Sequence, residues 1–145
     1  MQKERVVFCE VGTDGKLPQK ANKTDAGFDL YATSDITVLP GQIIKHPLNI
    51  KLNIPQSSYL EITSKSGNGV KGLLVYAGII DEGYRGTVHV VATNISDKPL
   101  EFKKHSKIAQ MIIHPYSSDV EIVAVESVST DTERGSGGFG SSGQF

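Results

Sequence analysis

Residues 78–86, GIIDEGYRG, place a carboxylate and a phenol three residues apart on a stretch bracketed by glycines. The apolar pair before Asp81 and the glycines around Tyr84 predict a β-hairpin with a sharp turn. Glycine reaches backbone angles that are closed to other residues and lets a ligand come close to the main chain. Asp81 and Tyr84 are therefore candidates for a binding or catalytic site, although the segment is also typical of a hairpin with a polar tip.

A second candidate lies in the Gly- and Ser-rich tail that begins near Val128. The guanidinium of Arg134 suits phosphate because it is always charged and donates two parallel hydrogen bonds. Successive glycine N–H groups can converge on an anion, and Ser141 and Ser142 add hydroxyl donors. The composition predicts a flexible tail. A plain Gly-Ser linker would lack Arg134 and Phe139, so composition alone does not explain the tail as a linker.

Strands must position these segments, because apolar and polar residues alternate along much of the chain. Residues 48–54 alternate strictly, as a half-buried strand does. No window has a convincing helical period. Many short strands separated by turn signals favour a β-sandwich or barrel, of which the jelly roll is one form. Further strands are predicted at Arg5–Val11, Phe28–Ala32, Gln42–Lys45, Tyr59–Thr63, Thr87–Thr93, Ile108–His114 and Val120–Val125.

Composition narrows the functional classes. The 145 residues are enough for one domain with a real core, and 38% of them are hydrophobic. The net charge of −1 gives no reason to expect a nucleic-acid or membrane partner. No apolar run approaches a membrane span, and the N-terminus lacks a signal-peptide pattern, so we expect an intracellular protein. Cys9 is the single cysteine, and the four scattered histidines lack zinc-ligand spacing.

Five segments in a fixed order make the chain resemble the trimeric dUTP pyrophosphatases (dUTPases). They are AGFDL at 26–30, SKSGN at 64–68, GIIDEGYRG at 78–86, KIAQM at 107–111 and RGSGGFGSSG at 134–143. The resemblance implies Mg²⁺-dependent hydrolysis of dUTP to dUMP and pyrophosphate, which removes dUTP and supplies the dTMP precursor. It also implies a jelly-roll-like β-barrel over residues 1–128 and a flexible arm over 129–145 that closes over the nucleotide. The protein would be a homotrimer with shared active sites.

The resemblance assigns the hairpin to catalysis and base recognition. Asp81 would accept a hydrogen bond from the 3′-hydroxyl and orient the attacking water. A carboxylate with a pKa near about 4 is a weak base at pH 7, so its contribution is mainly placement. Backbone groups around Gly78 and Ile80 would read the uracil edge. Tyr84 would pack on the deoxyribose and collide with a 2′-hydroxyl.

The other segments would hold phosphate and metal. Ser66 and Gly67 match the turn that binds the α- and β-phosphates, with Lys65 where the family more often has arginine. Gln110 would reach the α-phosphate or a metal-bound water, and Asp29 would support Mg²⁺ indirectly, through water. The family also more often has arginine at Lys107, and His105-Ser106 replaces a usual Gly-Asp; these positions are predicted to be turn structure.

In the arm, the resemblance places Arg134 on the phosphates and stacks Phe139 on the uracil. The arm residues assigned to the substrate are Arg134, Phe139, Gly140, Ser141 and Ser142.

Two other functions stay open. A dCTP deaminase of the same fold would need a general acid or base near the cytosine C4, and the hairpin offers only Asp81 and Glu82. Such relatives also lack the pattern of residues 134–143. The second alternative is a dUTPase-like signalling module with an extra protein partner, as phage relatives are thought to be.

Overall fold

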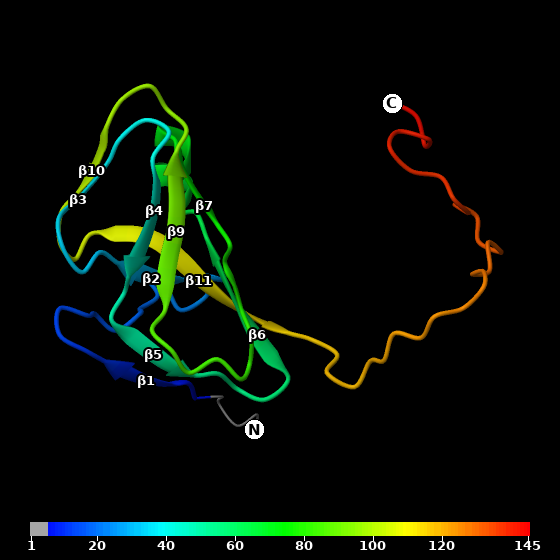
Figure 1. Cartoon of the computed structure of the whole chain (residues 1–145), viewed down its shortest axis with the longest axis horizontal. Coiled ribbons are helices and arrows are strands. Elements are labelled where there is room, and N and C mark those ends of the chain that lie inside the picture. Colours follow the sequence, from blue (N-terminus) through cyan, green and yellow to red (C-terminus); the bar gives the residue numbers. More distant parts are fainter. Residues whose placement is uncertain (1–5) are drawn as a thin grey trace.

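Residues 6–145 are described by a computed structural model (Figure 1). In this part of the chain the elements are strands and one short helix, which confirms the predicted all-β class. Their bounds are β1 (Phe8–Val11), β2 (Phe28–Tyr31), β3 (Ile36–Val38), β4 (Ile43–Pro47), β5 (Ile50–Asn53), β6 (Ser58–Thr63), α1 (Ser66–Lys71), β7 (Leu73–Tyr76), β8 (Ile79–Ile80), β9 (His89–Asn94), β10 (Leu100–Phe102) and β11 (Lys107–Pro115).

The described strands form four sheets around one apolar core, and every strand pairing is antiparallel. The largest sheet has the order β2-β11-β6-β8, and a second has the order β4-β9-β7. The remaining pairs are β1 with β5 and β3 with β10. Hydrogen bonding does not join these four sheets into one closed barrel within residues 6–145. Over the same residues, no helix is both long and apolar enough to cross a membrane.

The two-residue period places side chains on the core or the solvent face. In β5 the side chains of Ile50 and Leu52 are buried, whereas Lys51 and Asn53 are exposed. The same period runs through β6 and β9. Burying one large aliphatic side chain contributes roughly 1.5–3 kcal/mol, so a one-residue slip that exposed the whole set would be very costly. The core therefore fixes the register, and with it the polar residues on the sheet edges.

Most predicted strands are present with ends shifted by a few residues, and Arg5 lies outside the described residues. The strands β3, β7 and β10 were not predicted. Helix α1 was not predicted either, because six residues that include Gly67 and Gly69 cannot show a helical period. It ends at Gly72, whose φ of 108° lies in the left-handed region that glycine adopts without strain.

The chain after β11 leaves the body and extends far from it (Figure 1). The prediction of a strand at Val120–Val125 is wrong for the single chain, because these residues form no strand there. Their apolar side chains have nothing to pack against, and Ile122 is 95% exposed. A strand needs a neighbouring strand to satisfy its backbone groups, and this segment contacts none in its own chain.

Candidate active site

The hairpin is anchored to β6 by an antiparallel ladder. Leu60 pairs with Ile80, and the N–H of Ile62 donates to the carbonyl of Gly78 at 2.7 Å. A Cβ atom at Gly78 would lie 1.9 Å from the Ile62 carbonyl oxygen, closer than any side chain can approach. Glycine is therefore required here for the two strands to meet. The ladder fixes where Asp81 emerges from the sheet.

Asp81 and Tyr84 lie together, as predicted. The N–H of Tyr84 donates to the carbonyl of Asp81 at 3.1 Å, which closes the turn. The Tyr84 hydroxyl donates to the carbonyl of Thr87 at 2.8 Å, so the phenol ring is held across the hairpin. Asp81 is exposed, and both side chains border a concavity of about 200 Å³ that also includes Ile80 and His89.

His89 is a lining residue that the sequence did not indicate. It lies on β9, and its Nδ1–H donates to the carbonyl of Thr87 at 2.9 Å, the same oxygen that binds Tyr84. The tertiary fold brings it beside the hairpin, and no local motif signals this. The concavity can thus offer an exposed carboxylate, a fixed phenol and an imidazole to one polar ligand.

A second cluster of polar side chains lies toward the opposite edge of the largest sheet from the hairpin, on β2 and β11. Asp29 on β2 pairs with Gln110 on β11, and Gln110 pairs with Thr63 on β6. Asp29 is 4% exposed, and its carboxylate contacts two ammonium groups, those of Lys65 at 2.5 Å and Lys107 at 3.2 Å. Burial raises the pKa of Asp29, but the hydrogen bonds and charges of the two lysines outweigh burial and leave that pKa below its usual value. Asp29 is therefore a carboxylate at neutral pH, held between two cations.

Gln110 is fixed beside the SKSGN segment. Its Nε2 donates to the carbonyl of Ser64 at 2.9 Å, and its Oε1 lies so close to Gly27 that a Cβ there would be only 2.3 Å away. Lys65, which follows Ser64, immediately precedes α1, and no side chain caps that helix. Ser66 and Gly67, predicted as a turn, form the exposed first residues of α1. Their backbone N–H groups begin a helix and have no intrahelical partner.

The tail residues are not brought to either cluster. Arg134 donates from Nε to the carbonyl of Gly137 at 2.8 Å, and Ser141 donates its N–H to the carbonyl of Gly138 at 3.2 Å. Phe139 is fully exposed and has a φ of 50°. The tail thus forms local turns of its own, and its closure over a nucleotide stays a prediction.

The two clusters are separated within one chain. Continuing the β6–β8 register puts Asp81 opposite Tyr59, whereas Gln110 pairs with Thr63, four residues further along β6. At roughly 3.3 Å per residue this is a separation of about 13 Å along the strand. The backbone positions of Asp81 and Gln110 are therefore far apart in one chain, and a nucleotide that contacted both would have to bridge this distance with the length of both side chains.

No group of three or more His, Cys, Asp or Glu side chains that could hold a metal ion occurs within residues 6–145. Because the Asp29 carboxylate already contacts the ammonium groups of two lysines, it is not available as a direct ligand of a metal ion. An ion here would depend on oxygens that the ligand and water supply.

Comparison with known proteins gives a consistent result. The dUTPase family model matches residues 13–143. The deoxyuridine 5′-triphosphate nucleotidohydrolase of Kluyveromyces lactis is 42% identical over 134 residues, which covers 90% of this chain and 88% of that protein. The protein of the same name from Alkaliphilus metalliredigens is 38% identical, over 88% and 90% of the two chains.

Solved structures agree on the fold. A dUTPase mutant of Staphylococcus bacteriophage 80alpha with dUpNHpp aligns with a TM-score of 0.88 at 24% identity, over 97% of this chain and 99% of that one. Both the match to the family and the identity to its members extend over most of the chain. The chain belongs to the dUTPase family.

Proposed function

We propose that this dUTPase, which hydrolyses dUTP to dUMP and pyrophosphate, assembles each active site from several subunits of a homotrimer. The observation that carries the proposal is the separation of about 13 Å along β6 between the hairpin and the phosphate cluster. A hairpin from one subunit placed against the phosphate cluster of another would remove that gap. The reaction lowers the dUTP pool and supplies the precursor of dTMP.

Asp81 positions the reacting water. Its exposed carboxylate accepts hydrogen bonds from the 3′-hydroxyl and from a water molecule. The water oxygen attacks the α-phosphorus, the bond to the bridging oxygen breaks, and pyrophosphate leaves with that bond's electron pair. The proton of the water passes to Asp81 or to solvent. Asp81 accelerates the reaction chiefly by alignment for in-line attack.

The hairpin selects the nucleoside. The Tyr84 ring, held by its hydrogen bond to Thr87, would pack on the deoxyribose and collide with a 2′-hydroxyl. Backbone groups around Gly78 and Ile80 pair with the uracil edge. Cytosine presents a donor where uracil presents an acceptor, so it would leave a buried backbone group unpaired, which is costly.

The phosphates are bound by cations and N–H donors. Lys65 keeps the charge of the more usual arginine but loses the planar two-point geometry. The groups that we assign to the phosphate chain are Lys65, Ser66, Gly67, Gln110, Arg134, Gly140, Ser141 and Ser142. Phe139 stacks on the uracil when the arm closes.

Mg²⁺ fits this arrangement because it retains several waters and takes phosphate oxygens directly. Asp29, held by its two lysines, supports the ion through water. When bound, Mg²⁺ would neutralise charge on the phosphate chain. A dUTPase of Staphylococcus aureus phage phi11 has been described with a structural Mg(II) ion.

The detached arm supports the trimer. Residues 120–125 are rich in β-branched apolar residues, as strands are, yet they find no neighbouring strand within the described chain. We assign that segment to a neighbouring subunit, with the remaining arm closing a site there. The trimer would complete a jelly-roll-like body. A further protein partner, as predicted for a phage protein, stays a prediction.

The test is to incubate the protein with dUTP, dCTP, dTTP or UTP, with and without Mg²⁺, and to measure released pyrophosphate and ammonia. We expect pyrophosphate from dUTP alone, dependent on Mg²⁺, and no ammonia from dCTP. Ammonia release would indicate the deaminase instead. Sedimentation equilibrium of the same preparation tests the trimer, and a monomeric active enzyme would contradict the shared site.

A further inference from the structure

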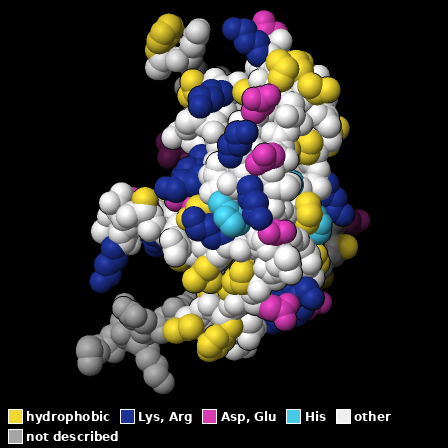
Figure 2. Space-filling view, turned by 90° about the vertical axis from the view of Figure 1, so that its left-hand side faces the viewer, with side chains coloured by type: hydrophobic (Ala, Val, Ile, Leu, Met, Phe, Trp, Pro, Cys, Tyr) yellow, Lys and Arg dark blue, Asp and Glu magenta, His cyan; other side chains and the backbone are white. Residues whose placement is uncertain are grey.

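His89 borders the hairpin concavity beside Asp81 and Tyr84, yet it has no role in the proposed reaction. The surface is less specific elsewhere: charged side chains of both signs are spread over the face shown in Figure 2. A mixed surface of this kind is typical of solvated protein and selects no particular ligand. An imidazole, in contrast, donates and accepts hydrogen bonds at fixed positions, so His89 is a chemically specific group at the edge of the site.

The ring of His89 has a defined tautomer. Its Nδ1 lies 2.9 Å from the carbonyl oxygen of Thr87, two residues earlier in the chain. A carbonyl oxygen can only accept a hydrogen bond, so Nδ1 carries the hydrogen and donates it. The Tyr84 hydroxyl donates to the same oxygen at 2.8 Å. The two side chains are therefore joined through one backbone acceptor, which has a lone pair for each of them.

The peptide unit that carries this acceptor has partners at both ends. Its other end is the N–H of Val88, which donates to the carbonyl of Ile50 at 2.9 Å. The carbonyl of Val88 accepts from the N–H of Leu48, also at 2.9 Å. One end of the peptide unit is thus held by the neighbouring chain segment, and the other is held by the side chains of His89 and Tyr84. Loss of the His89 donor would leave the Thr87 carbonyl freer to tilt.

The Tyr84 ring lies against the backbone of Gly86. A Cβ atom at Gly86 would be 2.6 Å from the Tyr84 hydroxyl oxygen and 2.7 Å from the ring carbon that bears it. The absence of a side chain at Gly86 makes room for the ring, and the Thr87 carbonyl holds its hydroxyl end. Tyr84 is 45% exposed, so packing alone does not fix the ring. Its place depends on where the Thr87 carbonyl points.

We propose that His89 is a positioning residue, which holds the Tyr84 ring through the carbonyl of Thr87 and so increases the preference for deoxyribose over ribose. This role rests on the proposed function, in which the Tyr84 ring would collide with a 2′-hydroxyl. Such a collision discriminates between the two sugars only while the ring keeps its place. A displacement of about 1 Å is enough to change how well a substrate is positioned.

The experiment compares substitutions of His89 that differ in where they place a donor. The amide nitrogen of asparagine lies near the position of Nδ1, that of glutamine lies near Nε2, and leucine has no donor. The measured quantity is the ratio of kcat/KM for dUTP to kcat/KM for UTP. We expect this ratio to fall about three- to tenfold in His89→Leu and His89→Gln, the usual effect of one lost hydrogen bond. In His89→Asn it should stay close to the wild-type ratio.

A double-mutant cycle tests the shared acceptor. Tyr84→Phe removes the hydroxyl that bonds Thr87, and the matched control Tyr76→Phe removes a hydroxyl that bonds Thr93 at 3.0 Å, on the same strand as His89. Once the Tyr84 hydroxyl is absent, adding His89→Leu should not lower the ratio further, because both changes act on one carbonyl. Tyr76→Phe should leave the ratio unchanged, alone and together with His89→Leu. Independent effects of Tyr84→Phe and His89→Leu would contradict the shared acceptor.

A measurement without nucleotide separates the role of His89 from the proposed function. In protein made with fluorotyrosine, the fluorine NMR signal of Tyr84 is identified by its loss in Tyr84→Phe. We expect this signal to differ between His89→Asn and His89→Gln, which both lack the imidazole ring and differ in the donor alone. Equal signals and equal ratios in these two variants would overturn the proposal, also if His89→Leu fails to fold. If the signals differ but Tyr84→Ala leaves the nucleotide ratio unchanged, the sugar selection by Tyr84 is wrong and the positioning by His89 stands.

Discussion

Asp81 and Asp29 are the same functional group in opposite surroundings, and the surroundings decide what each can do. Asp29 is buried between Lys65 and Lys107, so its charge is balanced and its oxygens are occupied. Asp81 is exposed beside Tyr84, and its oxygens can accept hydrogen bonds from a sugar hydroxyl and a water molecule. The first carboxylate organises neighbouring charges, and the second is free to meet a substrate.

The substitution Asp81→Asn should separate binding from turnover. The amide keeps the shape of the side chain but is a much weaker acceptor and cannot take a proton. We expect kcat to fall at least about 10²-fold, the usual contribution of a positioned base, with dUpNHpp affinity within a few-fold of the wild type. Steady-state kinetics and calorimetry on one preparation measure both quantities. Near-normal turnover would remove Asp81 from the mechanism.

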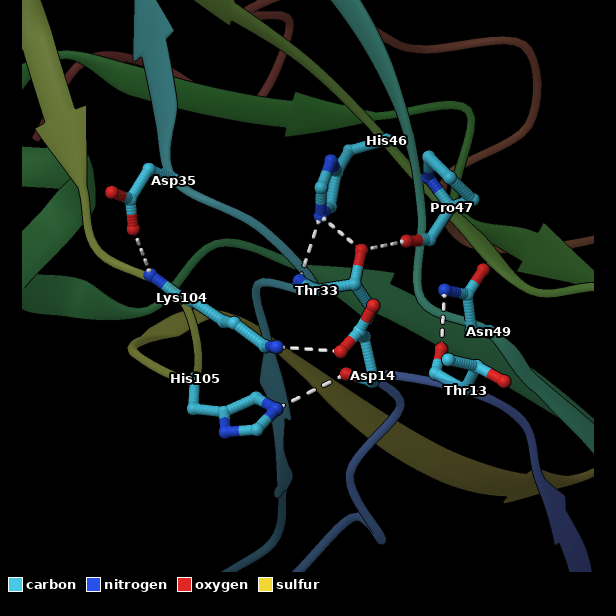
Figure 3. A network of polar contacts seen from close by, with 9 residues as sticks. All are labelled: Thr13, Asp14, Thr33, Asp35, His46, Pro47, Asn49, Lys104 and His105. Carbon is cyan, nitrogen blue, oxygen red and sulfur yellow. Dashed lines mark hydrogen bonds and ion pairs between the residues drawn. The ribbon is translucent and has the colours of Figure 1, made fainter.

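His46 is a buried histidine whose protonation should destabilise the fold. It is 8% exposed, and its Nε2 accepts a hydrogen bond from the Thr33 N–H at 3.0 Å (Figure 3). The hydroxyl of the same threonine donates to the carbonyl of Pro47 at 2.8 Å. Burial lowers the pKa of His46 below its ordinary value of 6.5, and the charge of His89 lowers it further. Only the neutral ring can accept the Thr33 hydrogen bond.

Because the pKa is lower in the folded state, the unfolded chain takes up the proton first as pH falls. The stability that His46 contributes is fully present above about pH 6.5 and is lost as pH falls through the folded-state pKa. His46→Gln keeps an acceptor that does not titrate, so its free energy of unfolding should change less between pH 7 and 5 than that of the wild type. Urea unfolding across this range measures the difference. Equal slopes for His46→Gln and the wild type would refute the assignment.

At the scale of elements, the hairpin depends on how closely β8 approaches β6. A methyl group at Gly78 would meet the Ile62 carbonyl at 1.9 Å, whereas one at Gly83 would meet no atom within 4 Å. The two glycines lie in the same hairpin but have opposite roles. Gly78 allows the strands to pair, and Gly83 lies in the exposed turn.

We therefore expect Gly78→Ala to destabilise the protein by about 1–3 kcal/mol, as other overpacking changes do, and to abolish turnover. Gly83→Ala should be close to the wild type in both respects. Thermal unfolding and dUTP hydrolysis measure the pair. Equal effects of the two substitutions would show that the close contact at Gly78 does not determine the hairpin.

The elements that the sequence predicted are those with a long two-residue period, such as residues 48–54 and 59–63. The three-residue strands β3 and β10 are too short to show a period, and β7 follows directly on α1. The pairing of Asp81 with Tyr84 was predictable because both lie in one hairpin. The contribution of His89 and the two lysines on Asp29 were not, because these contacts join residues distant in the sequence.

At the scale of the whole molecule, the body and the arm have different requirements. The body buries an apolar core within its own chain, although some of its large apolar side chains, such as Phe8 and Ile43, are mostly exposed. The arm has no core of its own, and its Val120, Ile122 and Val123 are mostly exposed. An exposed run of β-branched residues is typical of a strand that lacks its sheet. In the proposed trimer, neighbouring subunits would supply the contacts that the arm lacks within its own chain.

Mixing two inactive variants tests the sharing of sites. Asp81→Asn has a defective hairpin, and a truncation after Ser127 lacks the tail. In a cyclic trimer with three-subunit sites, each mixed trimer has one site with an intact hairpin and an intact tail. Random equal mixing makes about three quarters of trimers mixed, so co-refolded subunits should recover roughly a quarter of wild-type activity. Each variant refolded alone is the control, and no recovery at any ratio would contradict shared sites.

The exposed arm also affects how the protein is made. Translation delivers residues 6–115 before the arm, and the strand pairings of the body lie within those residues. A nascent chain can therefore complete the strand pairings of the body before the arm leaves the ribosome. Free subunits would then be the vulnerable species, and their lifetime would depend on how fast subunits meet. Low synthesis rates would prolong the exposure of the arm to proteases, and polysomes that bring nascent chains together would shorten it.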